Sequence, residues 1–348
     1  MIENYPNKRR MHCETGVLVN MMEYNGYHIS EPMAFGIGSG MYFLYFPKLR
    51  TSDATGTFPL VVLRTKPTCI IRNYTKRMHI GYHEQTFGKD AFKAERALDE
   101  LIAKNIPVGV VVNLIGVKYL NDLGFSVDYN GHHMTVIGKE GTQYIIADVD
   151  EKLPNDDYQV LEAAAMRSVR FRSGISAPHG RMFYFDQLPA DFAEITTLKS
   201  AIVSGLKETC KNMLSIPMPW FGCRGIHYYA KEMRKWPRKY SEEEIDKFLY
   251  AHYRFIEQAG TGGSGYRYIY SDFLKEAAEV FQSEALLKSS DIMRKAADSW
   301  RVFTVNGSRH IKKTGVTSNE MADIIDEAGN LEHETFVSIK DEFLKHVK

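Results

Sequence analysis

The chain has 348 residues, of which 44% are hydrophobic and 25% are charged, and its formal net charge is +1. These are ordinary values for a globular protein that buries a substantial core without disulfide support. A charge so close to zero gives no reason to expect nucleic acid or an anionic membrane as a partner. The sequence has no apolar run of about 18 residues, and its first residues lack the apolar core of a secretory signal. We therefore expect a cytoplasmic protein.

The four cysteines are widely spaced and form no C-x-x-C pair. This spacing predicts neither a zinc site nor a disulfide framework, and no metal or bound cofactor is expected. Cys69 and Cys210 lie in apolar or helical stretches and are interpreted as buried thiols. Cys13 has a different neighbourhood, because it directly precedes a helical pattern.

The first 150 residues mix helix and strand patterns. An amphipathic helix is predicted after Cys13, with its apolar stripe in ETGVLVNMMEY and a stop at Asn25-Gly26. A short helix is predicted to begin at Ser-Glu-Pro, residues 30–32. Glu31 is interpreted as a carboxylate in the first turn of this helix, and the alternative is that it contacts an amine-bearing acceptor. FGIGSG (35–40) indicates a tight turn with close packing rather than a dinucleotide-binding site. MYFLYF, which follows it, predicts a strand.

Further along this half, residues 90–105 predict an amphipathic helix and PVGVVVNLIG a buried strand. HHMTVIGKEGTQYIIADVD (132–150) predicts a β-hairpin around the turn GKEG. YQVLEAAAMRSVRF then predicts a helix, and RMFYFDQL one more strand, near 181–186, that would return to the first sheet. Helical periods fill most of the remainder: 191–214, 221–235, 242–259, 266–287, 290–304 and 318–346.

These patterns predict an α+β fold. An N-terminal domain with an antiparallel sheet, residues 1–152, precedes a mostly helical domain, residues 153–348. Short breakers separate the helices, notably GTGGSG (260–265), which lacks the Lys-Ser/Thr of a phosphate-binding loop and is interpreted as a helix cap and linker. The basic stretch MRKWPRK (233–239) is interpreted as solvated surface, with docking to an acidic partner as the alternative.

Cys13 is the residue most suited to covalent chemistry. The N-terminus of a helix lowers the pKa of a thiol there, because the free N–H groups favour negative charge. Antiparallel pairing around GKEG brings His132, at the start of one strand, beside Asp148, at the end of the other. His133 points to the opposite face of its strand, so only one of the two histidines can face Asp148. Cys13, His132 and Asp148 are thus the candidate nucleophile, base and orienting carboxylate.

The offsets of Gly138 and Asp148 from His132 resemble the histidine strand of papain-like cysteine peptidases, particularly the bacteriocin-processing branch that uses Asp as the orienting residue. The papain signature around the nucleophile is absent at Cys13. HCETGVLVNMMEYNGYHISEPMAFGIGSG resembles the opening of the butirosin-biosynthesis acyltransferase family, and GTGGSGYRYIYSDFLKEAAE and PWFGCRGIHYYAKEMRKWP resemble the helical domain that accompanies it. The resemblance implies a papain-like N-terminal domain.

The resemblance also implies an activity. Cys13 would take an acyl group from the phosphopantetheine thioester of an acyl carrier protein and pass it to a small amine, with His132 as base and then acid. The backbone N–H of Cys13 would supply one oxyanion donor, and Asn7, at the offset where papain-like enzymes place a Gln, is the candidate for the second. A papain-like hydrolase (peptidase, amidase or thioesterase) and a non-catalytic binding protein remain alternatives. A homodimer is left open.

Overall fold

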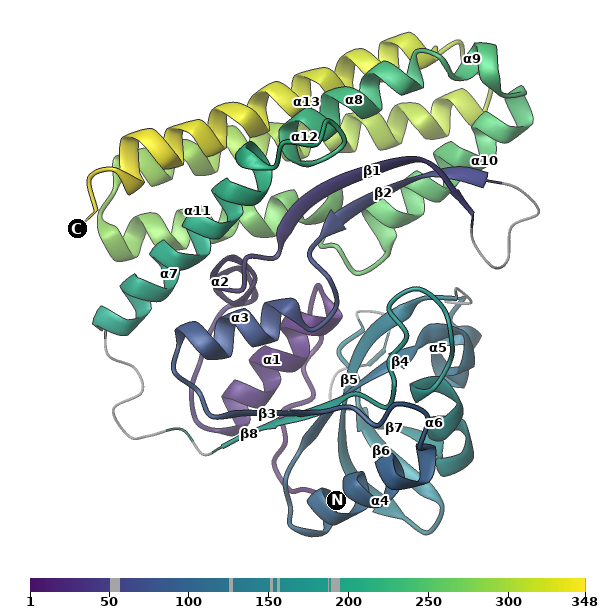
Figure 1. Ribbon diagram of the computed structural model, residues 1–348, viewed down its shortest axis with the longest axis vertical. Coiled ribbons are helices and arrows are strands. Elements are labelled where there is room, and N and C mark those ends of the chain that lie inside the picture. Colours follow the sequence, from purple (N-terminus) through teal and green to yellow (C-terminus); the bar gives the residue numbers. More distant parts are fainter. Residues whose placement is uncertain are drawn as a thin grey trace. The chain divides into compact units, whose positions relative to one another are not determined.

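The computed structural model describes residues 1–50, 57–124, 128–150, 153–154, 157–186, 188 and 195–347. Within them the chain forms two compact units, each built from separate segments (Figure 1). Unit 1 comprises Met1–Ala34 and Lys66–Leu198, and unit 2 comprises Phe35–Thr65 and Lys199–Lys348. The domain boundary that the sequence predicts after residue 152 lies outside the residues that the structure describes. Segment 35–65 groups with the later helices, and segment 157–186 with the N-terminal sheet.

Unit 1 combines helices with an antiparallel sheet. Its helices are α1 (Cys13–Tyr24), α3 (Cys69–Arg77), α4 (Ala91–Ala103), α5 (Lys118–Asp122) and α6 (Ala163–Arg170), with a 3-10 turn, η1 (Leu114–Gly116). α2 (Glu31–Ile37) spans the join between the units. The strands are β3 (Tyr82–Gln85), β4 (Val108–Asn113), β5 (Asn130–Glu140), β6 (Gln143–Ala147), β7 (Gln159–Glu162) and β8 (Met182–Phe185).

Among the described residues these strands form one six-stranded sheet in the order β3-β8-β4-β5-β6-β7. Every neighbouring pair runs antiparallel. β8 inserts between β3 and β4, which confirms that the strand pattern near 181–186 returns to the first sheet. The antiparallel sheet, followed by mostly helical structure, confirms the α+β class.

The β5-β6 hairpin is present, but its turn lies later than expected. Gly138 is inside β5, opposite Ile145, beside an irregularity in the ladder that follows Val136. The chain reverses at Gly141, whose φ of +56° is the left-handed conformation that glycine adopts without strain. One other expectation about this sheet also changes. The segment 158–171, expected to be a helix, forms strand β7 and then helix α6. Its first residues are extended because β7 pairs with β6 at the edge of the sheet.

Helix α1 differs from the expected amphipathic helix because it is buried on all sides. Every residue from Glu14 to Met22 is buried, including Glu14 itself and Asn20. Both polar side chains have partners: the Glu14 carboxylate accepts from the backbone N–H groups of Ile70 and Ile71, at the start of α3, and the Asn20 amide donates to the Lys8 carbonyl. Gly26, with φ +82°, follows the helix as predicted. A central helix of this kind holds its first residue, Cys13, in a fixed position.

The core of unit 1 lies where α4 and α6 pack on the sheet. It joins alternate residues of β4 and β5 with α4 and α6, notably Val110, Val136, Leu98 and Met166, all essentially inaccessible to solvent. β4 is buried along its whole length and β5 from Asn130 to Gly138, so both faces of these strands are covered and alternate residues face this core.

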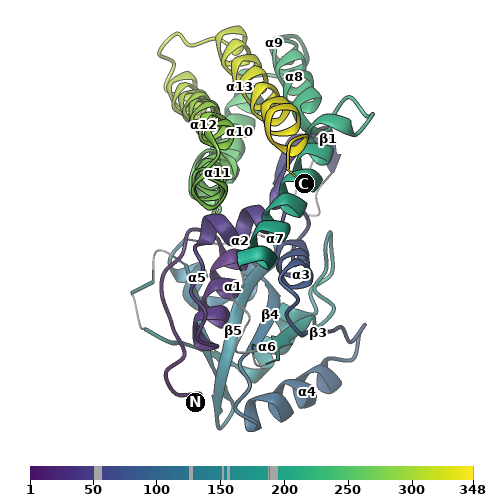
Figure 2. The same ribbon diagram turned by 90° about the vertical axis from the view of Figure 1, so that its left-hand side faces the viewer.

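Unit 2 contains a two-stranded antiparallel ribbon, β1 (Met41–Arg50) and β2 (Thr57–Arg64), and a group of helices. The helices are α7 (Ile195–Cys210), α8 (Gly222–Met233), α9 (Trp236–Lys239), α10 (Glu242–Tyr253), α11 (Arg267–Phe281), α12 (Glu284–Ile311) and α13 (Ser318–Ser338), with η4 (Ser264–Tyr266) before α11 and π-helical ends η2 (Lys211–Ser215), η3 (Arg254–Gln258) and η5 (Ile339–Leu344). α8, α12 and α13 run side by side (Figures 1 and 2). The helical periods of this half are confirmed with two differences. The break expected at 288–289 lies at Gln282-Ser283, so that α12 runs from Glu284 to Ile311, and residues 191–194 lie outside the described residues.

A buried ion pair lies inside unit 2. Arg267 binds Glu332 through Nε–Oε1 (2.8 Å) and Nη2–Oε2 (3.1 Å), and both side chains are fully withdrawn from solvent. Trp300 donates its indole N–H to the same carboxylate at 2.7 Å. In FGIGSG, residues 35–37 end α2 and the chain then turns at Ser39, whose φ is +54° and whose backbone N–H donates to the Gly36 carbonyl at 3.0 Å. The expected close packing is also present: a Cβ on Gly36 would come within 2.1 Å of the Phe273 ring, so the ring packs where a side chain would otherwise be. In the part of the chain that the structure describes, no helix is long and apolar enough to span a membrane.

Candidate active site

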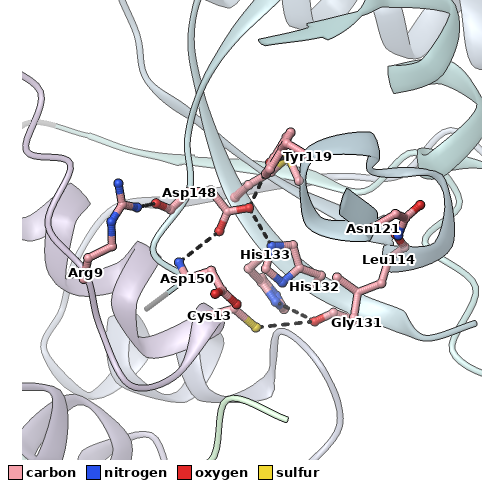
Figure 3. A network of polar contacts seen from close by, with 11 residues as sticks. Arg9, Cys13, Leu114, Tyr119, Asn121, Gly131, His132, His133, Asp148 and Asp150 are labelled. Carbon is pink, nitrogen blue, oxygen red and sulfur yellow. Dashed lines mark hydrogen bonds and ion pairs between the residues drawn. The ribbon is translucent and has the colours of Figure 1, made fainter. Parts of the chain in front are cut away.

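Cys13 occupies the first position of α1, after the N-cap residue His12. Its side chain is partly buried, and Sγ lies 3.9 Å from the carbonyl oxygen of Gly131, at the start of β5 (Figure 3). The N–H of a first helical residue has no acceptor within the helix. The Cys13 thiol and an unused backbone donor therefore lie at the same helix end.

His132 and Asp148 form a buried pair across the hairpin. His132 Nε2 lies 2.8 Å from Asp148 Oδ2, and the side chains are 7% and 0% exposed (Figure 3). A carboxylate bound to Nε2 keeps the proton on that nitrogen, which leaves Nδ1 as the basic nitrogen of the neutral ring. The side chains of His132 and Cys13 interact, since each shifts the pKa of the other. The structure thus brings together Cys13, His132 and Asp148, the three residues singled out in the sequence.

Asp148 is held by further donors. The hydroxyl of Tyr119, from α5, donates to Oδ2 at 2.9 Å, and the backbone N–H of Asp150 donates to Oδ1 at 3.3 Å (Figure 3). Arg9 binds the backbone carbonyl of Asp148. A carboxylate buried without a bonded cation is costly unless hydrogen bonds satisfy its oxygens. These contacts keep Asp148 in one orientation against His132.

The two reacting groups have opposite pKa shifts. Burial alone would raise the pKa of the Cys13 thiol, but hydrogen bonds from His12, His132 and His133 outweigh it and hold that pKa well below its ordinary value. Burial alone would lower the pKa of His132, but the charge and hydrogen bond of Asp148 raise it well above its ordinary value. Both shifts favour a thiolate beside an imidazolium, and the thiolate is the nucleophilic form of cysteine.

His133 lies on the other side of its strand, as the alternation predicts. Its Nδ1 lies 3.0 Å from the Gly131 carbonyl oxygen, the acceptor shared with Cys13, and its Nε2 lies 3.3 Å from Thr68 Oγ1. A carbonyl can only accept, so Nδ1 of His133 carries a proton. The two contacts hold the ring between Gly131 and Thr68.

Glu31 is buried beneath the start of α1. Its carboxylate accepts from the backbone N–H groups of Met11 (2.7 Å) and His12 (3.2 Å) and from the Thr15 hydroxyl (3.0 Å). Burial raises the pKa of Glu31, and these hydrogen bonds counter the rise. Because the carboxylate is used by the chain itself, the alternative in which Glu31 contacts an amine is not supported.

Asn7, the candidate second oxyanion donor, is fully buried. Its side-chain amide donates to the backbone carbonyl of Asp157 at 2.9 Å. The contact recorded for it is thus to the chain and not to the Cys13 thiol. Among the described residues no group of three or more His, Cys, Asp or Glu side chains is arranged to hold a metal ion.

The remaining features noted in the sequence are structural. Burial raises the pKa of the Cys210 thiol to about 12 and that of Cys223 well above its ordinary value. In the basic stretch 233–239, Lys235 and Lys239 both pair with Glu232, and Arg234 pairs with Asp326. These charges are neutralised locally, which weakens the docking alternative.

Sequence reasoning missed His12 and Tyr119 as site residues. His12 precedes Cys13 at a helix start, where an N-cap is expected, but histidine is not a preferred cap. Tyr119 lies on a short helix that no clear pattern marks, and only the fold brings it to Asp148.

The fold and the site together define an α+β protein in which a helix-start cysteine meets a buried histidine–aspartate pair. A model of the butirosin biosynthesis protein H N-terminal domain matches residues 12–149, which include Cys13, His132 and Asp148. A second model, described as a domain of unknown function (DUF4872), matches residues 164–339. The chain thus belongs to the DUF4872 family over residues 164–339, half of its length, and its residues 12–149 match the family of the butirosin biosynthesis protein H N-terminal domain. No curated protein matches the chain.

Proposed function

We propose that this protein is a cysteine-dependent acyltransferase that moves an acyl group from an acyl-carrier-protein thioester to a small amine. One observation carries the proposal: Sγ of Cys13 lies 3.9 Å from the carbonyl oxygen of Gly131, the residue before His132, and Nε2 of His132 is bound to the buried Asp148 carboxylate. The family description supports it, because it concerns the biosynthesis of butirosin.

In the first half-reaction the Cys13 thiolate attacks the thioester carbonyl. A tetrahedral intermediate forms, and its oxyanion accepts from the backbone N–H of Cys13 at the positive end of α1. The intermediate collapses by breaking the C–S bond to the carrier. The carrier thiolate takes a proton from the His132 imidazolium, which leaves an acyl-Cys13 thioester and a neutral imidazole.

In the second half-reaction an amine attacks acyl-Cys13. His132 Nδ1 takes a proton from the attacking nitrogen, an amide forms, and Cys13 leaves as the thiolate beside the imidazolium. Asp148 keeps the His132 ring in one orientation and balances its positive charge through both steps. Water in place of the amine would give a hydrolase with the same site.

The test uses acyl thioesters of N-acetylcysteamine as probes and intact-protein mass spectrometry as the readout. The wild-type protein should gain the mass of one acyl group, mapped to Cys13, and hydroxylamine should remove it. Cys13→Ala should gain nothing, while Cys69→Ala should behave as wild type. Acylation that persists in Cys13→Ala, or that never occurs with any thioester or carrier, would overturn the proposal.

The same assay, run with and without an amine acceptor, distinguishes acyl transfer from hydrolysis. Rapid release of free acid without any amine would favour the hydrolase. An acyl-enzyme that persists in water and is discharged by amines would favour the transferase.

A further inference from the structure

A cavity of about 310 Å³ lies in unit 2, between the C-terminal end of α7 and the helical turn η5. Four lysines line it, Lys207, Lys211, Lys340 and Lys345, and Cys210 and Leu344 also contribute to the lining. Sites for small molecules usually have volumes of ~300–1,000 Å³. The cavity is thus large enough for a small ligand, and none of its lining residues belongs to the Cys13 site.

The local helix geometry brings the lysines together in two pairs. Lys207 and Lys211 are four residues apart where α7 continues into η2, so they lie one turn apart on the same helix face. Lys340 lies in the π-helical turn η5, and Lys345 directly follows this turn. Because π-helical hydrogen bonds join residues five apart, these two lysines also share one face. Both sides of the cavity are therefore π-helical, a rare conformation that is frequent at functional sites.

Three of these four charges are not balanced by a carboxylate. Lys345 forms an ion pair with Asp341 at 3.0 Å. In the part of the chain that the structure describes, no carboxylate lies within ion-pair distance of Lys207, Lys211 or Lys340, and these side chains are exposed. Like charges one turn apart on a helix repel each other. An anion bound among the lysines would relieve this repulsion, so the cavity is suited to a ligand with several negative charges.

The cavity has binding groups but no nucleophile. The thiol of Cys210 donates to the Phe336 carbonyl at 3.7 Å, which links α7 to α13, and burial raises the pKa of this thiol to about 12. A lysine ammonium group offers three N–H donors and no acceptor. The chemistry of the lining therefore favours binding of an anion and not reaction with it.

We propose that this cavity is a binding site for a diphosphate group. Lysine ammonium groups are common ligands of phosphate oxygens. A carboxylate supplies one negative charge and a phosphate monoester about two at neutral pH, whereas a diphosphate carries more and matches the three unbalanced lysines best. The site is independent of the activity proposed for Cys13.

The test is isothermal titration calorimetry of the whole protein with inorganic pyrophosphate, at low ionic strength because salt screens exposed charges. We expect one pyrophosphate to bind per chain, at least tenfold more tightly than acetate, which carries a single charge. Absence of pyrophosphate binding, or acetate binding of equal affinity, would overturn the proposal.

A double substitution locates the bound anion. Lys207→Gln/Lys340→Gln removes one charge from each lysine pair and should weaken pyrophosphate binding about tenfold or more, because hydrogen bonds to charged groups are lost. The matched control, Lys231→Gln/Lys312→Gln, removes two exposed lysines of unit 2 that do not line the cavity, and its affinity should stay at the wild-type value.

The thermal unfolding midpoint without anion checks that the variant is folded. Lys207→Gln/Lys340→Gln should unfold at the wild-type temperature or slightly above it, because it loses only exposed side chains and their mutual repulsion. Equal weakening of pyrophosphate binding in the two double variants would overturn the proposal, since net charge alone would then attract the anion. These measurements use neither a thioester nor an amine, so a failure of acyl transfer would not affect their outcome.

Discussion

Nε2 of His132 and the hydroxyl of Tyr119 both approach one oxygen, Oδ2 of Asp148, at 2.8 and 2.9 Å. The imidazole comes from a strand and the phenol from a short helix, so the carboxylate joins two elements at the site. Because the two groups share this oxygen, the orientation of the His132 ring depends on Tyr119 as well as on Asp148.

The pKa shifts predict an unusual pH dependence of the Cys13 thiol. Because its pKa is well below the ordinary value, Cys13 should be alkylated by iodoacetamide below neutral pH, where a free thiol is almost fully protonated. Reactions that need the imidazolium should decline only as the pH rises through the raised pKa of His132. The internal control is Cys210, whose pKa of about 12 should keep it unmodified across this range. Equal labelling of the two thiols at pH 6 would contradict the prediction.

Asp148→Asn should slow acylation of Cys13 by about 10²–10⁴-fold, because an amide neither balances the imidazolium nor fixes its tautomer. The overall fold should persist, since the side chain keeps its size. Rates of acyl-enzyme formation from an N-acetylcysteamine thioester give the measurement. Asp150→Asn is the matched control: only the backbone N–H of Asp150 is recorded at Asp148, and the rate should stay at the wild-type value.

Tyr119→Phe removes one hydroxyl and leaves the ring in place. A hydrogen bond to a charged group contributes about 1.5–3 kcal/mol, so we expect acylation to slow about tenfold and the pH profile to shift, as Asp148 loses a donor. Tyr158→Phe removes a hydroxyl that donates to the Tyr5 carbonyl and should leave the profile unchanged. Identical pH profiles for the two variants would show that Tyr119 has no influence on the His132–Asp148 pair.

Glu332→Gln should destabilise unit 2 by about 3–5 kcal/mol, because it leaves the Arg267 charge buried without its partner. Urea unfolding followed by circular dichroism at 222 nm measures the change. Glu243→Gln breaks an exposed pair with Lys247 and should leave the transition where it is. If Glu332→Gln is as stable as Glu243→Gln, the Arg267–Glu332 ion pair does not contribute to the stability of unit 2.

Much of the local structure could be predicted from the residues. The stop at Asn25-Gly26, the helix at 91–103 and the strand at 108–113 follow from capping residues and apolar periods, which are properties of neighbouring residues. The hairpin offsets were enough to place His132 opposite Asp148, because register within a hairpin is a local matter. The turn itself was placed too early, since a ladder irregularity after Val136 carries Gly138 into the strand.

The tertiary structure decided what the sequence left open. Residues far apart in the chain meet at Cys13, and no short-range pattern marks Tyr119, Thr15 or Glu31 as neighbours of the site. Burial of α1 on every side, and the grouping of residues 35–65 with the later helices, depend on contacts between distant segments, which periodicity cannot report. By itself the sequence determined which side chains could carry the chemistry. The tertiary structure decided how Asp148 and His132 are held, because the groups that bind Asp148, the Tyr119 hydroxyl and the Arg9 guanidinium, come from segments far apart in the chain.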